Sequence, residues 1–366
     1  MHRMILGFAI LAAAATLAVP VAAQTSDSPQ IENARVEKKA QSGSLAAQVK
    51  SWAAQASEPQ WLGYAVPQIG RERTMCCGDY DGSWRNGCGH CRLEDGRSGM
   101  NMTSNEPGSA KLEAPRSIAL LFRADNKRVM KIRVVSPECS LDAGGLPFVW
   151  LSGVKPAESV ELLETFVHGT DFDARDDDHI SHAALTAIAL HLDPAADRAL
   201  ESFTRTTEPE SLRKQTAFWL GAAREKAGLA MLQKMAKNDP SSEVRAQVTF
   251  ALSVSHQQGA VEEMIRMAHD DQSGHVRGQA LFWLAQKAGQ KAVGAITGAI
   301  DNDPDTDVKK KAVFALSQLP KDEGVPKLIE VAQTNRNREV RKQAMFWLGQ
   351  SHDPRALAFF EKILSQ

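Results

Sequence analysis

Hydrophobic residues recur through the C-terminal half of the chain at one fixed interval, which starts a new copy at Leu212, Val244, Val276, Val308 and Val340. Within each copy, the positions 4, 7 and 8 after this opening residue fall within about 80° of it around a helix, so they form one apolar stripe. The copies read LRKQTAFWL, VRAQVTFAL, VRGQALFWL, VKKKAVFAL and VRKQAMFWL, and a degenerate copy, ISHAALTAIAL, begins at Ile180. Each copy therefore predicts one amphipathic helix.

A second helix is predicted ahead of each of these, because further apolar residues stand fifteen and twelve positions before the opening residue. They are Leu229, Val261, Val293 and Val325 in one series and Leu232, Met264, Ile296 and Leu328 in the other, and the two series continue into Leu357 and Phe360. Neither helix of a pair buries its stripe alone, so the pairs must stack. We expect an all-α solenoid of six helix pairs plus a terminal helix over residues 156–366.

The turns between the helices add a sequence signature. Asp-Pro precedes the second helix in two copies, at residues 239–240 and 303–304, which gives the pattern D-P-x-x-x-V-R-x-x-A-x-x-x-L. This pattern resembles the short HEAT repeat of the family that includes the bilin lyases and deoxyhypusine hydroxylase, over roughly residues 158–366. The resemblance implies a helical-repeat fold but no particular activity. The hydroxylase would require His-Glu dyads as iron ligands, and the sequence contains no His-Glu pair.

Charged residues also follow the repeat. A basic residue comes directly after the opening residue, and an acid or amide stands five positions before it. The basic series is Arg213, Arg245, Arg277, Lys309 and Arg341, and the other is Asp239, Asp271, Asp303 and Asn335. We interpret the two series as an ion-pair ladder along the stack, in which the acid also accepts hydrogen bonds from free N–H groups at a helix start. This ladder is architecture, not a ligand site.

Phenylalanine occupies a register where a polar residue is expected. The sixth position after the opening residue lies about 120° from the core stripe, and it holds Phe218, Phe250, Phe282, Phe314 and Phe346. Two interpretations stay open. The rings either pack on the neighbouring repeat and widen the core, or line a concave face of the solenoid and bind a partner protein or peptide.

Amides and tryptophans accompany the phenylalanines. The third position holds Gln215, Gln247, Gln279 and Gln343, with Lys311 interrupting the series, and the seventh alternates between Trp219, Trp283 or Trp347 and Ala251 or Ala315. We interpret the tryptophans as core residues that recur in every second copy. We predict that the phenylalanines and glutamines together form the partner-binding surface.

The N-terminus indicates export. His2 and Arg3 precede an apolar run from Met4 to Val19, and small residues lead up to Gln24, so residues 1–23 read as a cleaved signal peptide. No later apolar stretch is long enough to span a membrane. Removing Arg3 leaves 42 of the 43 basic residues against 44 acidic ones, a net charge of about −2, which argues against a nucleic-acid partner. We expect a secreted or periplasmic protein.

Residues 24–155 lack the repeat and contain all five cysteines of the chain. Residues 44–56 predict a helix, residues 61–67 an extended segment, and residues 117–124 and 128–135 a β-hairpin. We expect a small α+β module with a cysteine-rich loop, which caps the amino-terminal end of the solenoid. Cross-links would contribute much of its stability.

Three interpretations of the cysteines, Cys76, Cys77, Cys88, Cys91 and Cys139, stay open. Export favours structural disulfides, whose connectivity the sequence does not give. The tetrapeptide Cys88-Gly-His-Cys91 matches the active site of protein disulfide isomerases, which makes a thiol-disulfide oxidoreductase the alternative function, although the flanking strand and helix of that fold are not predicted. The third interpretation is a zinc site that uses Cys76 or Cys77, Cys88, Cys91 and either His90 or Cys139.

Other candidate chemistry is weak. The acidic stretch from Asp171 to His179 lacks the glycine and terminal glutamate of a calcium loop, so we interpret it as a solvated loop. Histidines such as His182, His191, His256 and His352 have no partner at ligand spacing. We expect a non-enzymatic protein-interaction scaffold, and no cofactor unless zinc binds the cysteine loop.

Overall fold

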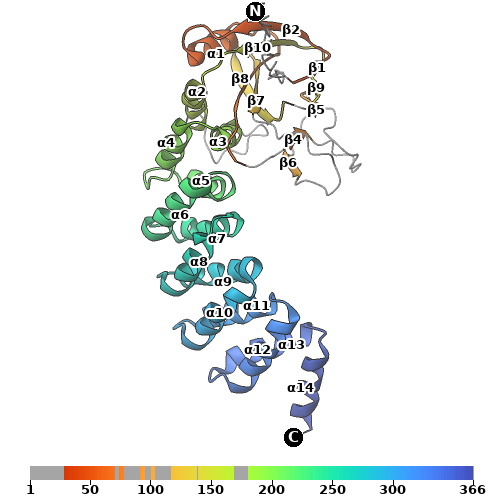
Figure 1. Ribbon diagram of the computed structural model, residues 1–366, viewed down its shortest axis with the longest axis vertical. Helices are drawn as coiled ribbons and strands as arrows, with labels where there is room; N and C mark the ends of the chain where they lie inside the picture. The colour runs from red at the N-terminus through yellow and green to blue at the C-terminus, as the bar shows by residue number, and fades with distance from the viewer. Residues whose placement is uncertain are drawn as a thin grey trace, which may run out of the picture.

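The computed structural model describes residues 29–70, 74–77, 91–94, 100–103, 117–137, 139–168 and 180–365, with the backbone alone for 74–77 and 100–103. Within these residues a β-rich module is followed by a long stack of helices (Figure 1).

The main element of the module is a five-stranded sheet with the strand order β2-β10-β3-β7-β8. The predicted hairpin is present as β7 (Ser117–Asp125) and β8 (Arg128–Val135), and the predicted extended segment is β3 (Gln60–Pro67). Two strands of this sheet, β2 (Arg35–Ala40) and β10 (Pro147–Ser152), were not predicted. Strand β10 lies between β3 and β2 and runs parallel to both. Parallel neighbours come from distant parts of a chain, so local sequence gives no register for them.

The remaining elements of the module are short. Helix α1 (Leu45–Ala54) begins at the predicted position, where the Ser44 side chain accepts a hydrogen bond from Ala47 N. A three-stranded sheet has the order β1 (Ile31–Glu32), β9 (Leu141–Asp142) and β5 (Cys91–Arg92), and β4 (Thr74–Cys77) pairs with β6 (Met100–Thr103). The α+β character of the module is confirmed.

Six helix pairs and a terminal helix form the solenoid, as the sequence periodicity predicts. The first helices of the pairs are α2 (Pro156–His168), α4 (Pro194–Phe203), α6 (Glu225–Asn238), α8 (Gly259–Asp270), α10 (Gln290–Asn302) and α12 (Lys321–Thr334). Their second helices are α3 (Ile180–Leu190), α5 (Glu210–Ala223), α7 (Ser242–Val254), α9 (Gly274–Ala288), α11 (Thr306–Ser317) and α13 (Arg338–Gln350), and α14 (Pro354–Leu364) follows. Each second helix from α5 onward packs on the second helix of the next repeat.

The module and the solenoid share one hydrophobic core. On one face of the sheet, the buried side chains of Tyr64 and Phe122 belong to the same cluster as Leu163 of α2 and Leu185 of α3, and this cluster continues along the helices. The end of β3 also pairs with the chain after α3, where Ile69 N donates to Leu190 O at 2.9 Å and Leu192 N donates to Pro67 O at 2.8 Å. The sheet therefore covers the first repeat and closes that end of the stack (Figure 1).

The other face of the sheet has a smaller, separate core. It contains Trp61, Leu121, Phe148 and Trp150 of the sheet, together with the cysteine side chains of the short strand β5 and the β8–β9 connection. This core is independent of the solenoid.

The expected ion-pair ladder is present at three successive junctions. The guanidinium of Arg213 lies 2.8 Å from Asp239, that of Arg245 lies 2.8 Å from Asp271, and that of Arg277 lies 2.7 Å from Asp303. Each pair is bidentate and joins one second helix to the turn of the next repeat. Each aspartate also accepts a hydrogen bond from the N–H two residues further on, at Ser241, Ser273 and Asp305. The ladder thus fixes both the stacking and the turns.

Candidate protein-binding surface

The five phenylalanines lie in one row on successive second helices, α5 to α13, and we call them the phenylalanine row. Phe218, Phe250, Phe282 and Phe314 are half-buried, and Phe346, the last of the row, is 54 % exposed. Each ring therefore packs on its neighbours with one side and leaves the other accessible. The sequence left two interpretations open, namely packing against the neighbouring repeat and an accessible face. The rings of the row show both features together.

Ring geometry in the row alternates from one junction to the next. Phe218 stacks on Phe250 with centroids 6.0 Å apart and an interplanar angle of 13°, and Phe282 stacks on Phe314 at 5.9 Å and 5°. At the intervening junctions a tryptophan takes the place of the second ring. Phe250 lies 4.8 Å from Trp283 at 45°, and Phe314 lies 4.9 Å from Trp347 at 39°.

The alternation follows from the residue at the seventh position. Where that residue is Ala251 or Ala315, the small side chain leaves room for two phenylalanine rings to stack directly. Where it is Trp283 or Trp347, the indole lies between the phenylalanine before it and the one beside it. Trp219 is buried as expected of a core residue, but Trp283 and Trp347 are only half-buried. The rings thus form one continuous aromatic ladder with a period of two repeats.

Amide groups accompany the row. Gln215 is exposed, and Gln247, Gln279 and Gln343 are half-buried. None of these four side chains hydrogen-bonds to another residue in the part of the chain that the structure describes. A second series of amides, not predicted from the sequence, stands four residues after the last three phenylalanines. Its members are Gln286, Gln318 and Gln350, all of them exposed. Their regular spacing of one repeat was the signal that would have identified them.

The C-terminal end of the aromatic ladder adjoins a hollow of about 230 Å³ between α11, α12 and α13. Leu316, Leu319 and Leu328 form apolar walls, Trp347 lies on one side, and Gln318 and Gln350 contribute amides. The surface thus combines apolar rings, amides and one recess, which suits a protein or peptide ligand.

Residues 198–285, 261–345 and 295–366 match the family model described as HEAT repeats. Over these residues the solenoid is built of HEAT repeats. The expectation from the sequence pattern is therefore confirmed. No curated protein matches the chain.

The chain is also similar to solved structures, three of which follow. Human deoxyhypusine hydroxylase in complex with glycerol is 17 % identical, over 57 % of this chain and 90 % of that one, with a TM-score of 0.29. YibA of Escherichia coli is 23 % identical over 58 % and 79 %, with a TM-score of 0.35. The complex of CpcE and CpcF of phycocyanin lyase from Nostoc sp. PCC7120 is 14 % identical over 58 % and 83 %, with a TM-score of 0.27.

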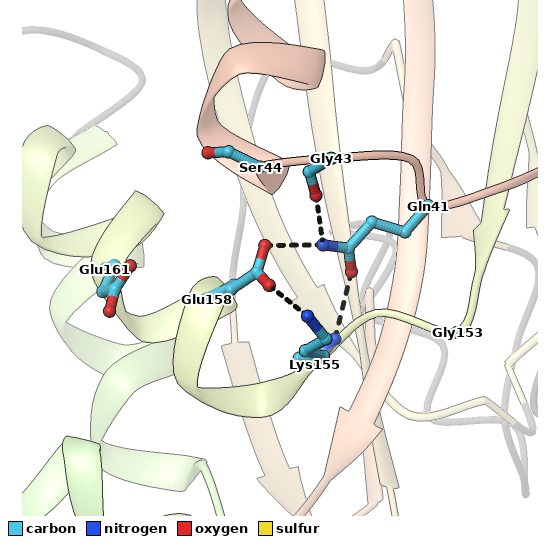
Figure 2. A pocket seen from close by; sticks show the side chains of 7 residues that line it. All are labelled: Gln41, Gly43, Ser44, Gly153, Lys155, Glu158 and Glu161. Atoms are coloured by element: carbon cyan, nitrogen blue, oxygen red, sulfur yellow. Dashed lines mark hydrogen bonds and ion pairs between the residues drawn. The ribbon is translucent and has the colours of Figure 1, made fainter.

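A second cavity, of about 510 Å³, lies where the module meets the HEAT solenoid (Figure 2). The Glu158 carboxylate accepts hydrogen bonds from Gln41 Nε2 at 2.6 Å, from Leu45 N at 3.0 Å and from Lys155 Nζ at 2.9 Å. Because Leu45 opens α1, this carboxylate also stabilises the positive end of that helix. These polar groups are paired with one another, so we interpret the cavity as a structural junction.

The candidate cysteines are only partly covered by the structure. Cys91 and Cys139 are fully buried in the smaller core, and both are disulfide-bonded. Cys88 and the side chains of Cys76 and Cys77 lie outside the described residues. Among the residues that are described, no group of three or more His, Cys, Asp or Glu side chains is placed to hold a metal ion. The zinc and oxidoreductase interpretations stay predictions, as does the acidic loop 171–179, which also lies outside.

His191, to which the sequence assigned no role, is buried and takes part in a chain of hydrogen bonds. His191 Nδ1 lies 2.6 Å from Ala187 O, and because a carbonyl only accepts, Nδ1 carries the proton. His191 Nε2 therefore accepts from Ser159 Oγ at 2.9 Å, and Ser159 Oγ in turn accepts from the Tyr64 hydroxyl at 2.8 Å. Burial lowers the pKa of His191 to about 4. This chain of hydrogen bonds joins β3 to the first HEAT repeat, and it is closed to solvent.

Proposed function

We propose that this protein is an exported, non-enzymatic scaffold that binds a partner protein or peptide along the phenylalanine row of its HEAT solenoid. HEAT repeats support an interaction role, because stacked repeats present an extended surface that is independent of any catalytic group. The module would then serve to cap the solenoid.

The observation that carries the proposal is the partial exposure of the phenylalanine row. A ring needed only for stability would be enclosed between repeats, as Leu220, Leu252 and Leu284 are. The rings instead keep an accessible side next to Gln215, Gln247, Gln279 and Gln343, whose amides have no hydrogen-bond partner among the described residues. A peptide backbone offers both the carbonyls and the N–H groups that such amides bind.

Export is part of the proposal and has support from the leader sequence alone, residues 1–23. In the described part of the chain, no helix is both long and apolar enough to cross a bilayer. The nearly balanced net charge supports a protein partner over a nucleic acid. We propose a secreted or periplasmic location.

The test is capture of partners from an envelope extract by three proteins: the wild type, a variant with Gln247, Gln279 and Gln343 changed to Glu, and a control variant with Gln233→Ser and Lys237→Ser. The Glu changes place negative charges beside the phenylalanine row and keep the size of each side chain. Gln233 and Lys237 are exposed on α6, a first helix away from the row. We expect the control to retain the wild-type set of bound proteins and the Glu variant to lose it, with unchanged circular dichroism. Equal capture by all three proteins would contradict the proposal.

A Phe346→Ser variant gives a second measurement. Because this ring ends the row and is 54 % exposed, its loss should weaken binding of an identified partner with little change in melting temperature. The other four rings of the row are less suitable for this test, because each takes part in two aromatic pairs whereas Phe346 takes part in one. Each pair contributes about 1 kcal/mol of packing.

A further inference from the structure

The hollow between α11, α12 and α13 has an internal counterpart two repeats earlier in the chain. The aromatic ladder repeats with this period: the Phe250–Trp283 geometry of 4.8 Å and 45° returns at Phe314–Trp347 as 4.9 Å and 39°. Trp283 and Trp347 therefore hold corresponding places in the aromatic ladder, although α7 ends at an extended residue, Ser255, and α11 ends in a helical turn at Gln318. The group that fills the space beside Trp283 indicates what kind of group fits beside Trp347.

At the earlier position a lysine ammonium fills the space. Lys287, one turn after Trp283, donates hydrogen bonds from Nζ to Ser253 O at 2.7 Å and to Ser255 O at 2.6 Å, at the C-terminal end of α7. Burial lowers the pKa of this ammonium group, yet the two carbonyls hold it. The end of a helix favours a cation there because its last carbonyls carry partial negative charge.

At the later position the lysine is missing and the hollow is open. The residues equivalent to Ser253, Ser255 and Lys287 are Ser317, Leu319 and Ser351, and all three line the hollow. Ser351 is too short to reach across, and its Oγ donates to Leu348 O at 2.7 Å within its own helix. Within the described chain, no donor hydrogen-bonds to the carbonyl of Ser317 or of Leu319.

Two further groups at this junction lack partners. The indole Nε1 of Trp347 is buried and donates to no acceptor, and Oε2 of Glu323 is buried and accepts from no donor, in each case among the described residues. Glu323 directly precedes Gly324 in the wall of the hollow, and its counterpart at the earlier position is Gly259, which has no carboxylate. The hollow therefore lies beside two buried polar atoms whose hydrogen-bonding capacity is unused among the described residues. The charged side chain that lines the hollow, Lys321, is exposed and opposes a cation.

We propose that this hollow binds a primary ammonium group, in the way that the protein holds its own Lys287. The apolar wall of Leu316, Leu319 and Leu328 would receive the alkyl stem, and the Ser317 and Leu319 carbonyls would receive the N–H donors. The ligand is a lysine side chain of a partner or a free alkylamine. Only the first source rests on the proposed scaffold function.

The experiment titrates the full chain with three probes: n-butylammonium, N-acetyl-lysine methylamide and its Nε-acetylated form. Binding is followed by calorimetry and by the NMR signal of the Trp347 indole N–H. We expect one site for both amines and at least tenfold weaker binding of the acetylated probe, which keeps the stem and loses the charge. If the lysine amide binds more strongly than butylammonium, the natural ligand is a lysine side chain of a protein. If the two bind equally, the natural ligand is a free alkylamine.

Two variants test the internal template. Ser351 is the residue equivalent to Lys287, so Ser351→Lys places the protein's own ammonium group in the hollow. This variant should reduce amine binding at least tenfold. Lys287→Ser should open an equivalent hollow at Ser253 and Ser255 and raise the stoichiometry from one to two. Lys321→Gln should strengthen binding, because it removes a like charge. Acetylated and free amines that bind equally, or a Ser351→Lys variant that binds as the wild type does, would overturn the proposal. Neither result depends on the partner of the phenylalanine row.

Discussion

Ser159 Oγ donates a hydrogen bond to His191 Nε2 at 2.9 Å, inside the junction between the module and the first HEAT repeat. The imidazole is fully buried, and its second nitrogen donates to Ala187 O. Protonation would give Nε2 a hydrogen that Ser159 cannot accept without turning its own hydroxyl away from the ring. The neutral form is therefore the one that this junction stabilises.

This relationship predicts a pH dependence of stability. Burial lowers the pKa of His191 from 6.5 to about 4, so between these values the unfolded chain binds a proton that the folded chain does not. Stability is complete above pH 6.5 and falls as the pH drops toward 4, by on the order of 3 kcal/mol in total. Urea unfolding of the wild type and of His191→Gln, measured from pH 4 to 7, should show a slope that the variant lacks. Identical slopes would contradict the assignment.

The Arg213–Asp239 pair should be the most costly of the ladder to break, because both side chains are nearly inaccessible. Asp239→Asn keeps an oxygen for Ser241 N, as Asn335 does for Asn337 N at 2.9 Å. The change therefore removes the charge and leaves the turn. We expect a loss of about 3 kcal/mol, since Arg213 remains buried without its carboxylate. Hydrogen exchange should report the opening at α5 to α7 first, and unchanged protection there would contradict the ladder's role.

The ladder of Arg–Asp pairs ends at the junction between the fifth and sixth helix pairs, where Lys309 and Asn335 replace the arginine and the aspartate. Lys309 Nζ donates to Asp301 O at 2.7 Å instead of crossing to the next repeat. The double change Lys309→Arg and Asn335→Asp should restore the pair and stabilise the C-terminal repeats by about 1 kcal/mol. Each single change should contribute little, so a double-mutant cycle in urea measures the coupling. Additive effects would show that the geometry of this junction differs.

Two glycines at the same repeat position should respond to alanine in opposite ways. A Cβ on Gly221 would lie 2.1 Å from Ala251 O in the next second helix, whereas one on Gly349 would meet no atom within 4 Å. Gly221→Ala should therefore destabilise the protein by roughly 2 kcal/mol. Gly349→Ala should stabilise it by roughly 0.5 kcal/mol, because alanine favours a helix interior. Thermal unfolding of the two variants distinguishes them, and a neutral Gly221→Ala would contradict the close approach of α5 and α7.

The sequence by itself determined the solenoid, its helix pairs and the Arg–Asp ladder, because each depends on a register that recurs once in every repeat. It also identified the hairpin and α1, whose signals are local. It did not predict β2 and β10, which pair in parallel with strands far away in the chain.

Only the tertiary structure decided the environment of each ring and carbonyl. Periodicity placed the phenylalanines beside the core stripe but could not divide each ring into a packed and an accessible side, since that depends on whether Ala251 or Trp283 faces it from the next repeat. Likewise, Lys287 and Ser351 carry no distinguishing signal in the sequence. Their significance arises because stacking brings each one to the last carbonyls of a second helix in the preceding repeat, as the bonds of Lys287 to Ser253 and Ser255 show.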